Sequence, residues 1–497
     1  MGAVRLHHRG RLRLIGALLV GALFGSGATV FVLGGWGAGS QLPFGALAGD
    51  VPTPPVKAPA EFRRLVDAYA ILRDGYVDKQ AATPDRLIDG AIRGMVSSLD
   101  DPYTTYLDPE ELKQFEESLS SSFEGIGTEV TMIGGKLTVV SPIKGSPAEK
   151  AGIRPNDQIL SVNGESLEGL SLQEAVKKIR GPKGTKVVLE IVRSGMSEPI
   201  TITVVRDTIP LESVHSKLYD VQGVKLGWIE ITSFAENTAQ RFFEEMKRLD
   251  REGARGFVID VRGNPGGYLE AVTGILEELV PREGILYQVE DRNGERQVYR
   301  SKLKGDGRPL VVLIDEGSAS ASEILAAALK GAGYPVVGTP SFGKGTVQVT
   351  RDLTGGGSIK LTVAKWLAPD GTWIHKKGVQ PTVAVKQPDY FHLPPLTVEA
   401  PLRRDMNDQA VAVLQKMLNA LGLPVDRTDG YFDASTEAQV RAFQQQEGLP
   451  VTGVVDGATG ARLSERLYQK IKDPANDVQL KKALQVLAQE VRTRAAR

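Results

Sequence analysis

The chain has 497 residues, about three times the length of a typical domain, so we expect several domains. Hydrophobic residues make up 41% and charged residues 24%, which excludes global disorder. Sixty basic side chains balance sixty acidic ones, so no overall field favours nucleic acid as a partner. Cysteine is absent, which excludes disulfides, thiol nucleophiles and cysteine-ligated zinc. With five histidines no multi-histidine metal centre is expected, and no other cofactor is implied.

The first 40 residues predict a membrane anchor. Residues 1–13 carry four arginines and no acid, and the 25 residues of 14–38 carry no charge. At about 1.5 Å per residue such a helix exceeds a ~30 Å hydrocarbon core. The arginines are expected to stay cytoplasmic, which places the rest of the chain outside, at the cell membrane. The alternative is secretion after cleavage of a signal peptide near 46–48.

Residues 41–60 are rich in proline, glycine and alanine, which is typical of a stiff linker. After the linker the pattern turns helical over 61–119, with further helices expected around 87–96 and from Pro109 to Ser118. One apolar stripe at helical spacing is formed by Phe62, Leu65, Val66, Tyr69 and Leu72. We interpret this region as a packing element or a homodimer interface.

Residues 120–205 predict a mainly β module with one helix. The run 158–162 alternates like a strand and ends in the turn pair Asn163-Gly164. A capping box over Ser171 to Glu174 begins the helix. This stretch closely resembles a PDZ domain. The matching pieces are Gly145-Ser-Pro-Ala148, Ala151-Gly-Ile153, Asp157, Ile159-Leu160 and Val162-Asn-Gly164.

The PDZ resemblance implies that the carboxyl end of a peptide is added as a strand to a sheet edge. It also implies that the loop Phe123-Glu-Gly-Ile-Gly127 holds the terminal carboxylate. Backbone N–H groups of Gly125, Ile126 and Gly127 would bind it, since glycine lets backbone approach an anion closely. The alternative is that the two glycines only permit a tight bend.

Two continuous apolar runs, 256–261 and 310–315, predict strands of a central sheet covered on both faces. Each precedes a loop and a helical pattern, which indicates βαβ units. The loops are Arg262-Gly-Asn-Pro-Gly-Gly267 and Glu316-Gly-Ser-Ala-Ser-Ala-Ser-Glu323. A serine in such a turn is well placed as a nucleophile, because the helix amino terminus directs N–H groups towards a developing oxyanion. The alternative is that Ser318, Ser320 and Ser322 only cap the helix.

The segment Ser341-Phe-Gly-Lys-Gly-Thr-Val-Gln348 favours the nucleophile over the cap. Lys344 lies between two glycines, and Gln348 follows four residues later in a predicted strand, so the two can face one side. Burial would lower the pKa of Lys344 from about 10.4 towards 7 and make it a general base for a serine, with Gln348 orienting the amine. By contrast, His215, His375 and His392 lie outside any strand-to-helix turn and are interpreted as ordinary polar positions.

These motifs occur in order over residues 61–385, which resemble the carboxyl-terminal processing proteases, tail-specific serine peptidases with an embedded PDZ domain. The matching motifs are Asp100-Asp-Pro-Tyr-Thr-Thr-Tyr106, Asp260-Val-Arg-Gly-Asn-Pro-Gly-Gly267, Gly317-Ser-Ala-Ser-Ala-Ser-Glu-Ile324 and Gly338 through Gln348. The resemblance implies a multidomain α/β protein with a crotonase- or ClpP-like core. No metal or nucleotide is implied.

Carried over by position, Ser320 is the nucleophile, Lys344 the general base and Gln348 the third member. The resemblance places the N–H groups of Ala321 and Gly266 in the oxyanion hole. One departure is that the spacing from Ser320 to Lys344 is one residue shorter than the family pattern. We expect the deletion in a loop near 334–335, where it is harmless. A second departure is Gly263, where the family often has asparagine.

A different pattern begins near residue 401. A helix face over 411–421 precedes two copies of Gly-x-x-Asp-x-x-Thr, at 430–436 and 453–459, each predicting an Asp cap on a helix. This stretch resembles the three-helix peptidoglycan-binding domain of bacterial wall enzymes. We therefore divide the chain after the PDZ domain into a protease core over 206–390, a linker over 391–400, a peptidoglycan-binding-like domain over 401–468 and a charged helical tail over 469–497.

The sequence thus predicts an extracytoplasmic serine endopeptidase that recognises unstructured protein carboxyl termini through its PDZ domain. The expected partners are such protein substrates, the membrane and peptidoglycan, with no nucleic acid. Two alternatives stay open: a catalytically inactive PDZ and peptidoglycan-binding scaffold of the envelope, and a different acyl-transfer enzyme, since crotonase-type cores share the same strand, glycine turn and helix.

Overall fold

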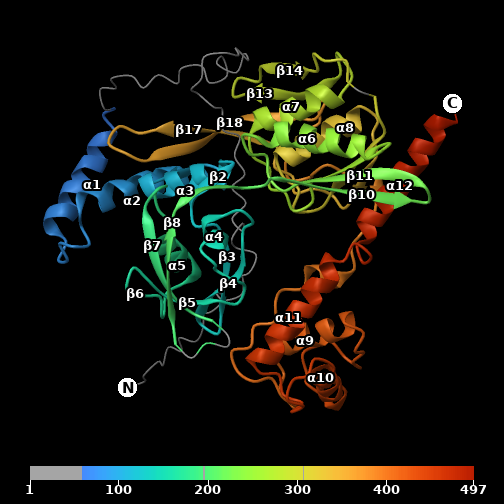
Figure 1. The fold of residues 1–497 in the computed structure, drawn as a ribbon. Helices are drawn as coiled ribbons and strands as arrows, with labels where there is room; N and C mark the ends of the chain where they lie inside the picture. Colours follow the sequence, from blue (N-terminus) through green and yellow to red (C-terminus); the bar gives the residue numbers. More distant parts are fainter. Residues whose placement is uncertain (1–58, 194–195, 197, 306, 497) are drawn as a thin grey trace, which may run out of the picture. The chain divides into compact units, whose positions relative to one another are not determined.

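The computed structural model describes residues 59–496 except 194, 195, 197 and 306. The predicted anchor over 1–40 and nearly all of the linker over 41–60 lie outside these residues. Within the described part of the chain, no helix is both long and apolar enough to cross a membrane. The chain divides into two compact units, one of residues 387–477 and one of 59–386 together with 478–496 (Figure 1).

The larger unit is built on a mostly parallel sheet, in which the predicted strands at 256–261 and 310–315 are confirmed as parallel neighbours. Only the pairing of β10 with β11 is antiparallel among the described strands of this sheet. In spatial order its strands are β10 (Val214–Val221), β11 (Val224–Ile231), β12 (Phe257–Asp260), β15 (Leu310–Ile314), β16 (Val336–Gly338) and β19 (Val383–Ala384).

Alternate residues along this sheet face two different layers, as its continuous apolar strands predict. Val312 and Ile314 pack with α6 (Thr238–Arg251), α7 (Leu269–Leu279) and α8 (Ala321–Gly331). Val311 and Leu313 pack instead against α12 (Val478–Ala495). The buried residues of α12 in this layer are Leu480, Ala483, Leu484, Leu487, Ala488 and Val491. The predicted tail over 469–497, to which the sequence assigned no purpose, therefore supplies the second cover of the protease core.

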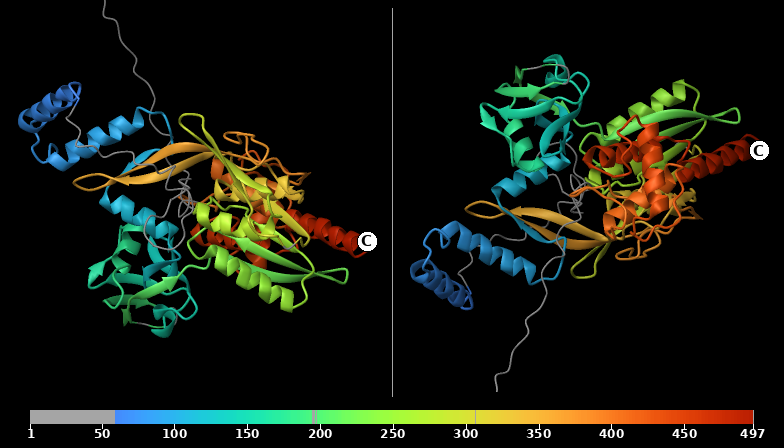
Figure 2. Two further views of the ribbon diagram at one scale, coloured as in Figure 1. Left: turned by 90° about the horizontal axis from the view of Figure 1, so that it is seen from above. Right: turned by 90° about the horizontal axis from the view of Figure 1, so that it is seen from below.

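A second sheet carries the segment that contains Lys344. Its strands are β1 (Thr105–Leu107), β18 (Ser358–Leu367), β13 (Ile285–Asp291) and β14 (Arg296–Arg300), with β17 (Thr346–Asp352) also paired to β18. The β17–β18 hairpin extends from the core towards the amino-terminal helices, and β1 pairs with it through Thr105 opposite Lys360 (Figure 2). Residues from before the PDZ domain thus become part of the sheet beside Lys344.

The PDZ module has its own core and an open sheet edge at β3 (Thr128–Ile133). The capping box of Ser171 and Glu174 is confirmed, and Asn163 and Gly164 have φ values of 53° and 83°, as their predicted turn requires. The other elements are β2 (Ser122–Gly125), β4 (Lys136–Pro142), α4 (Pro147–Lys150), β5 (Gln158–Val162), β6 (Glu165–Ser166), α5 (Leu172–Ile179), β7 (Lys186–Val192), β8 (Ile200–Val205) and β9 (Asp207–Pro210).

The smaller unit packs α9 (Gln409–Ala420), α10 (Ala434–Gln446) and α11 (Gly457–Lys472) around one apolar core, after a short 3-10 turn at Asp389–His392. Both predicted caps are confirmed, because the Asp433 and Asp456 carboxylates accept 2.8 Å hydrogen bonds from the N–H groups of Thr436 and Thr459.

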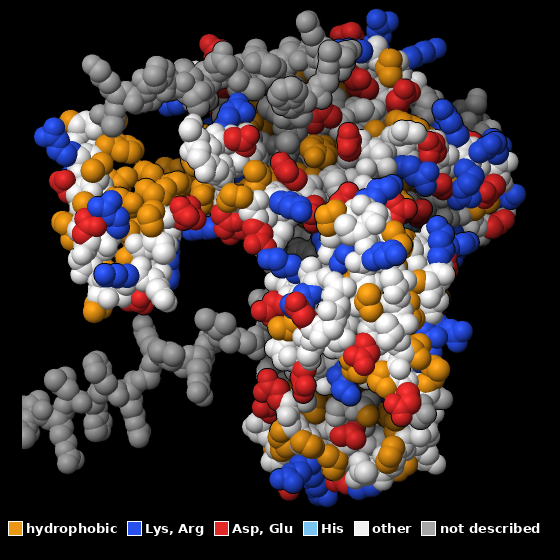
Figure 3. All heavy atoms as spheres, turned by 60° about the vertical axis from the view of Figure 1, so that its left-hand side comes forward, with side chains coloured by type: hydrophobic (Ala, Val, Ile, Leu, Met, Phe, Trp, Pro, Cys, Tyr) orange, Lys and Arg blue, Asp and Glu red, His pale blue; other side chains and the backbone are white. Residues whose placement is uncertain are grey.

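The amino-terminal region contains α1 (Phe62–Gly75), α2 (Pro84–Ser97) and α3 (Pro109–Leu119), which confirms the three predicted helices. Neither α1 nor α2 buries a residue within the described chain. Hydrophobic side chains consequently gather on the surface of these helices (Figure 3). The exposed large apolar residues of this region are Phe62, Val66, Ile71, Leu72, Tyr76, Val77, Ile88, Met95 and Leu99.

Candidate active site

The turn between β15 and α8, together with the first residues of α8, holds three buried serines, and their hydroxyl groups make different contacts. Ser318 Oγ donates a 2.8 Å hydrogen bond to the carbonyl of Val261, and Ser322 Oγ donates a 2.8 Å bond to the carbonyl of Asn264. Ser320 Oγ has no hydrogen-bond partner among the described residues. The hydroxyl groups of Ser318 and Ser322 thus stabilise the turn, whereas the Ser320 hydroxyl is free to react.

The backbone at Ser320 is strained. Its φ of 58° and ψ of −111° lie in a region that costs a non-glycine residue about 1–3 kcal/mol and is common at functional sites. Ser320 is at the same time the N-cap residue of α8, and its N–H donates a 2.8 Å hydrogen bond to the carboxylate of Glu323, three residues further on. Ala321 begins α8, where the first N–H groups of a helix have no partner within the helix.

The glycine-rich loop after β12 is joined to this turn by Asn264, which is fully buried. The Asn264 carbonyl accepts a 3.0 Å hydrogen bond from the N–H of Ala319, and its Oδ1 accepts a 2.8 Å bond from the N–H of Gly266. The Gly266 N–H is thus already engaged in this conformation, and its place in the oxyanion hole stays a prediction. The sequence did not single out Asn264, although an amide within a glycine-rich turn was an available signal.

Lys344 is a buried lysine whose amine makes no hydrogen bond to the described residues. Its side chain is 1% exposed, and Nζ finds no hydrogen-bond partner in the part of the chain that the structure describes. Burial, together with the positive charge of Lys360, lowers the pKa of Lys344 to about 7, despite the opposing charges of Glu323 and Asp101. A large fraction of the amine is therefore neutral near pH 7, as a general base requires.

The glycines on either side of Lys344 have a steric reason. A Cβ at Gly343 would lie 2.9 Å from the backbone nitrogen of Lys377, and a Cβ at Gly345 would lie 2.8 Å from Trp373 Nε1. Glycine therefore lets the chain pass close to the segment that follows β18. This approach is what buries Lys344.

Gln348 lies in β17 and is fully buried. Its Nε2 donates to Thr346 Oγ1 at 2.9 Å and to Thr362 Oγ1 at 3.0 Å, while Oε1 has no partner within the described residues. The predicted strand is confirmed, but a β-bulge separates Val347 from Gln348, and Lys344 precedes the strand. Strand alternation therefore does not bring Lys344 and Gln348 to one side, contrary to the spacing argument.

Glu323 is a residue of this cluster that the sequence analysis missed. It is fully buried, and its carboxylate accepts hydrogen bonds from the N–H groups of Ser320 and Lys344, both at 2.8 Å. The N–H of Gly343 and the hydroxyl of Ser341 donate to the same carboxylate. Burial nevertheless raises the pKa of Glu323. The available signal was an acid at the start of an otherwise apolar helix.

One histidine also lies beside the Lys344 segment. His375 Nδ1 accepts a 3.4 Å hydrogen bond from the N–H of Gly345, and burial lowers the pKa of this imidazole. The sequence treated His375 as an ordinary polar position, because it lies outside any strand-to-helix turn. His215 lies in β10 and His392 in the 3-10 turn, apart from these residues in the chain's order.

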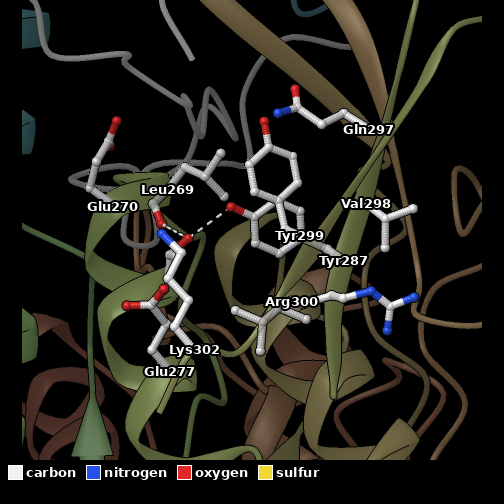
Figure 4. A pocket seen from close by; sticks show the side chains of 11 residues that line it. Leu269, Glu270, Glu277, Tyr287, Gln297, Val298, Tyr299, Arg300 and Lys302 are labelled. Carbon is white, nitrogen blue, oxygen red and sulfur yellow. Dashed lines mark hydrogen bonds between the residues drawn. The ribbon is translucent and has the colours of Figure 1, made fainter. Parts of the chain in front are cut away.

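A cavity of about 150 Å³ opens between α7 and the β13–β14 hairpin (Figure 4). The rings of Tyr287 and Tyr299 stack in its wall at 4.7 Å, and Tyr287 is hydrogen bonded to Thr273 at 2.9 Å. Its described lining includes neither Ser320 nor Lys344. The cavity is therefore separate from the serine–lysine cluster.

Four family models match parts of this chain. Family models match the peptidase family S41 over residues 225–385, a PDZ domain over 138–193, a peptidoglycan binding domain over 407–463 and the N-terminal domain of the activating protease CtpB over 49–111. The core match contains Ser320, Lys344 and Gln348. These matches define the class as a peptidase with an embedded PDZ domain.

Two Bacillus subtilis proteins are similar over most of the chain. The carboxy-terminal processing protease CtpB is 48% identical over 426 residues, covering 85% of this chain and 88% of the relative. The carboxy-terminal processing protease CtpA is 42% identical over 97% of this chain and 99% of the relative. A solved structure, the photosystem II D1 C-terminal processing protease, is 30% identical over 66% of this chain and 93% of its own, with a TM-score of 0.40. The chain belongs to the carboxy-terminal processing serine proteases of peptidase family S41.

Proposed function

We propose that this chain is an extracytoplasmic endopeptidase that cleaves unstructured polypeptides through a Ser320 acyl-enzyme, with Lys344 as the general base. One observation carries the assignment. Among the serines described in the turn before α8, the hydroxyl left without a hydrogen bond belongs to Ser320, and the amine of the buried Lys344 is also unused.

In the proposed reaction, neutral Lys344 Nζ takes the proton from Ser320 Oγ as this oxygen attacks the scissile carbonyl carbon. The N–H groups of Ala321 and Gly266 stabilise the resulting oxyanion. The lysine then returns the proton to the leaving amine, and water hydrolyses the acyl-enzyme by the same route. Gln348 Oε1 accepts a hydrogen bond from the amine and adds no charge that would raise the pKa of Lys344.

The conformation described here is a resting one in this proposal. Neither Ser320 Oγ nor Lys344 Nζ has a hydrogen-bond partner among the described atoms, and the Gly266 N–H is engaged by Asn264. Catalysis therefore requires the lysine side chain to move and the Gly266 turn to change its hydrogen bond.

Substrate carboxyl termini are proposed to bind as an added strand along β3, which is an edge strand. The loop with Gly125, Ile126 and Gly127 precedes β3 and would hold the terminal carboxylate. Gly127 has a φ of 76°, and a Cβ there would lie 2.5 Å from Cβ of Ser146, so glycine is needed at this position.

The location is proposed from the sequence. A basic segment and 25 uncharged residues precede the described chain and would anchor it in the cell membrane, with the catalytic unit outside. The peptidoglycan-binding domain would then bind the wall polymer. The exposed apolar face of α1 and α2 favours a homodimer formed through these helices.

Degradation of an unstructured protein by the full-length chain in detergent, without metal, tests the chemistry. Wild type is expected to cut, and Ser320→Ala and Lys344→Ala are expected to be inactive although they still bind a tail peptide. Cleavage by Ser320→Ala would show that the nucleophile is misassigned, and an inert wild type with peptide bound would favour a scaffold.

A further inference from the structure

The motif Asp100-Asp-Pro-Tyr-Thr-Thr-Tyr106 brings an aromatic ring to the amine of Lys344. Lys344 Nζ lies 5.0 Å from the centre of the Tyr103 ring, a cation–π distance. Tyr103 comes from the segment before β1, more than 200 residues earlier in the chain. The motif has no other role in the proposed reaction.

The position of the Tyr103 ring is fixed on its own side. Asp101 accepts hydrogen bonds from the N–H of Tyr103 at 3.1 Å and from Thr104 Oγ1 at 2.6 Å. Thr104 Oγ1 in turn accepts a 3.1 Å bond from the N–H of Thr362 in β18. The turn that carries the ring is therefore tied to the sheet that carries Gln348.

The ring is also fixed from the other side by two further aromatic side chains. His375 meets Tyr103 edge-on at 6.2 Å and stacks on Trp373 at 4.9 Å. Trp373 Nε1 donates a 2.7 Å hydrogen bond to the carbonyl of Gly345, the residue that follows Lys344. The aromatic wall is thus attached to the backbone of the Lys344 segment itself.

None of the described charged groups around Lys344 is hydrogen bonded to its amine, which contacts the Tyr103 ring instead. Glu323 and Asp101 are the nearby carboxylates, and their oxygens accept bonds from backbone and hydroxyl donors, not from Nζ. Lys360 is a nearby base whose positive charge disfavours a second one on Lys344, and the imidazole of His375 lies beside the same segment. The negative face of an aromatic ring can hold an ammonium group without neutralising it.

We propose that Tyr103 is a positioning residue whose ring holds the charged Lys344 amine out of hydrogen-bond contact with Ser320 in the resting enzyme. Loss of the proton removes the attraction to the ring and frees the amine to reach Ser320 and Gln348. This inference rests on the proposed role of Lys344 as general base. It predicts that the ring face, and not merely its bulk, sets the pH at which the enzyme becomes active.

The test compares the pH dependence of kcat/KM from pH 5 to 9, measured on full-length enzymes with an unstructured fluorogenic polypeptide. This profile reports the pKa of the free enzyme's base. Tyr103→Phe keeps the ring and is expected to keep the wild-type midpoint. Tyr103→Leu keeps apolar bulk but loses the ring face, and its midpoint is expected about 0.5–1.5 pH units lower, the size of a buried cation–π contact.

Two controls separate this effect from others. Repeating the comparison in a His375→Asn background removes the imidazole that lies beside the Lys344 segment. Tyr390→Leu removes a ring 5.5 Å from Lys470 in the smaller unit and is expected to leave the midpoint unchanged. Thermal unfolding of each variant shows whether it is folded. If Tyr103→Leu fails to fold, pentafluorophenylalanine in place of Tyr103 keeps the shape, reverses the ring electrostatics and is expected to lower the midpoint.

The inference is overturned if Tyr103→Leu, or the fluorinated ring, has the midpoint of Tyr103→Phe or a higher one. In that event an inactive Lys344→Ala leaves the proposed function intact. An active Lys344→Ala would instead overturn the proposed function.

Discussion

The carboxylate of Glu323 accepts a 2.8 Å hydrogen bond from the backbone N–H of Lys344. The two residues are 21 positions apart in the chain. The same carboxylate accepts a 2.8 Å bond from the N–H of Ser320. One buried side chain therefore sets the positions of the two backbones that carry the proposed nucleophile and base. This role is structural, since no substrate atom needs to touch Glu323.

We expect Glu323→Gln to lower kcat at least tenfold and to destabilise the protein. A glutamine has a single acceptor oxygen and an NH₂ group that would face buried donors, and each unsatisfied donor costs about 1–3 kcal/mol. Turnover and thermal unfolding measure the two effects. Glu124→Gln, on an exposed residue of β2, serves as the control. Equal behaviour of both variants would refute the positioning role.

Lys344→Met is expected to abolish cleavage and to raise the stability of the protein. The pKa of Lys344 is about 7 in the folded chain and near 10.5 when unfolded, so the unfolded chain binds more protons between these values. Wild-type stability should therefore increase with pH from 7 to 10.5 through this group. The stabilisation by methionine should be largest below pH 7 and decrease above it. Melting temperatures at pH 6 and 9 check the sign, and a difference that grows with pH would contradict it.

Leu487→Ala is expected to destabilise the protease core although it lies near the end of the chain. Leu487 is fully buried against the sheet, and truncating a buried leucine costs about 2–5 kcal/mol. The midpoint of chemical denaturation, followed together with peptidase activity, measures the loss. Gln485→Ala changes an exposed position of the same helix and should have little effect. An unchanged midpoint for Leu487→Ala would show that α12 does not cover the sheet in solution.

Gly127→Ala is expected to weaken binding of a peptide with a free carboxyl terminus at least tenfold. The added Cβ would collide with Ser146, and a φ of 76° is strained for alanine. Gly134→Ala is the matched control, since Gly134 also has a positive φ of 57° but open space around it. Fluorescence anisotropy with a free-acid and an amidated peptide measures the effect. Equal losses in both variants would point to strain alone.

Replacing Val66 and Ile71 by glutamate is expected to convert a homodimer into a monomer. Their side chains are 59% and 70% exposed on α1, and a charge on an apolar interface is costly to bury. Analytical ultracentrifugation of the full-length protein in detergent gives the mass, with Arg63→Glu as the control. A monomeric wild type would exclude the proposed interface.

Local patterns in the sequence determined most of the helices, a minority of the strands, among them those over 158–162, 256–261 and 310–315, and the caps of Ser171, Asp433 and Asp456, because these depend on residues close together in the chain. Ordered motifs likewise placed Ser320 and Lys344 in one family-like core. Only the tertiary structure decided which serine hydroxyl is left unused, because this depends on Val261 and Asn264 from another loop. It also decided that α12 covers the central sheet, and that Glu323, His375 and Tyr103 lie around Lys344. These contacts join segments that are far apart in the chain, and no local periodicity records which distant surfaces bury one another.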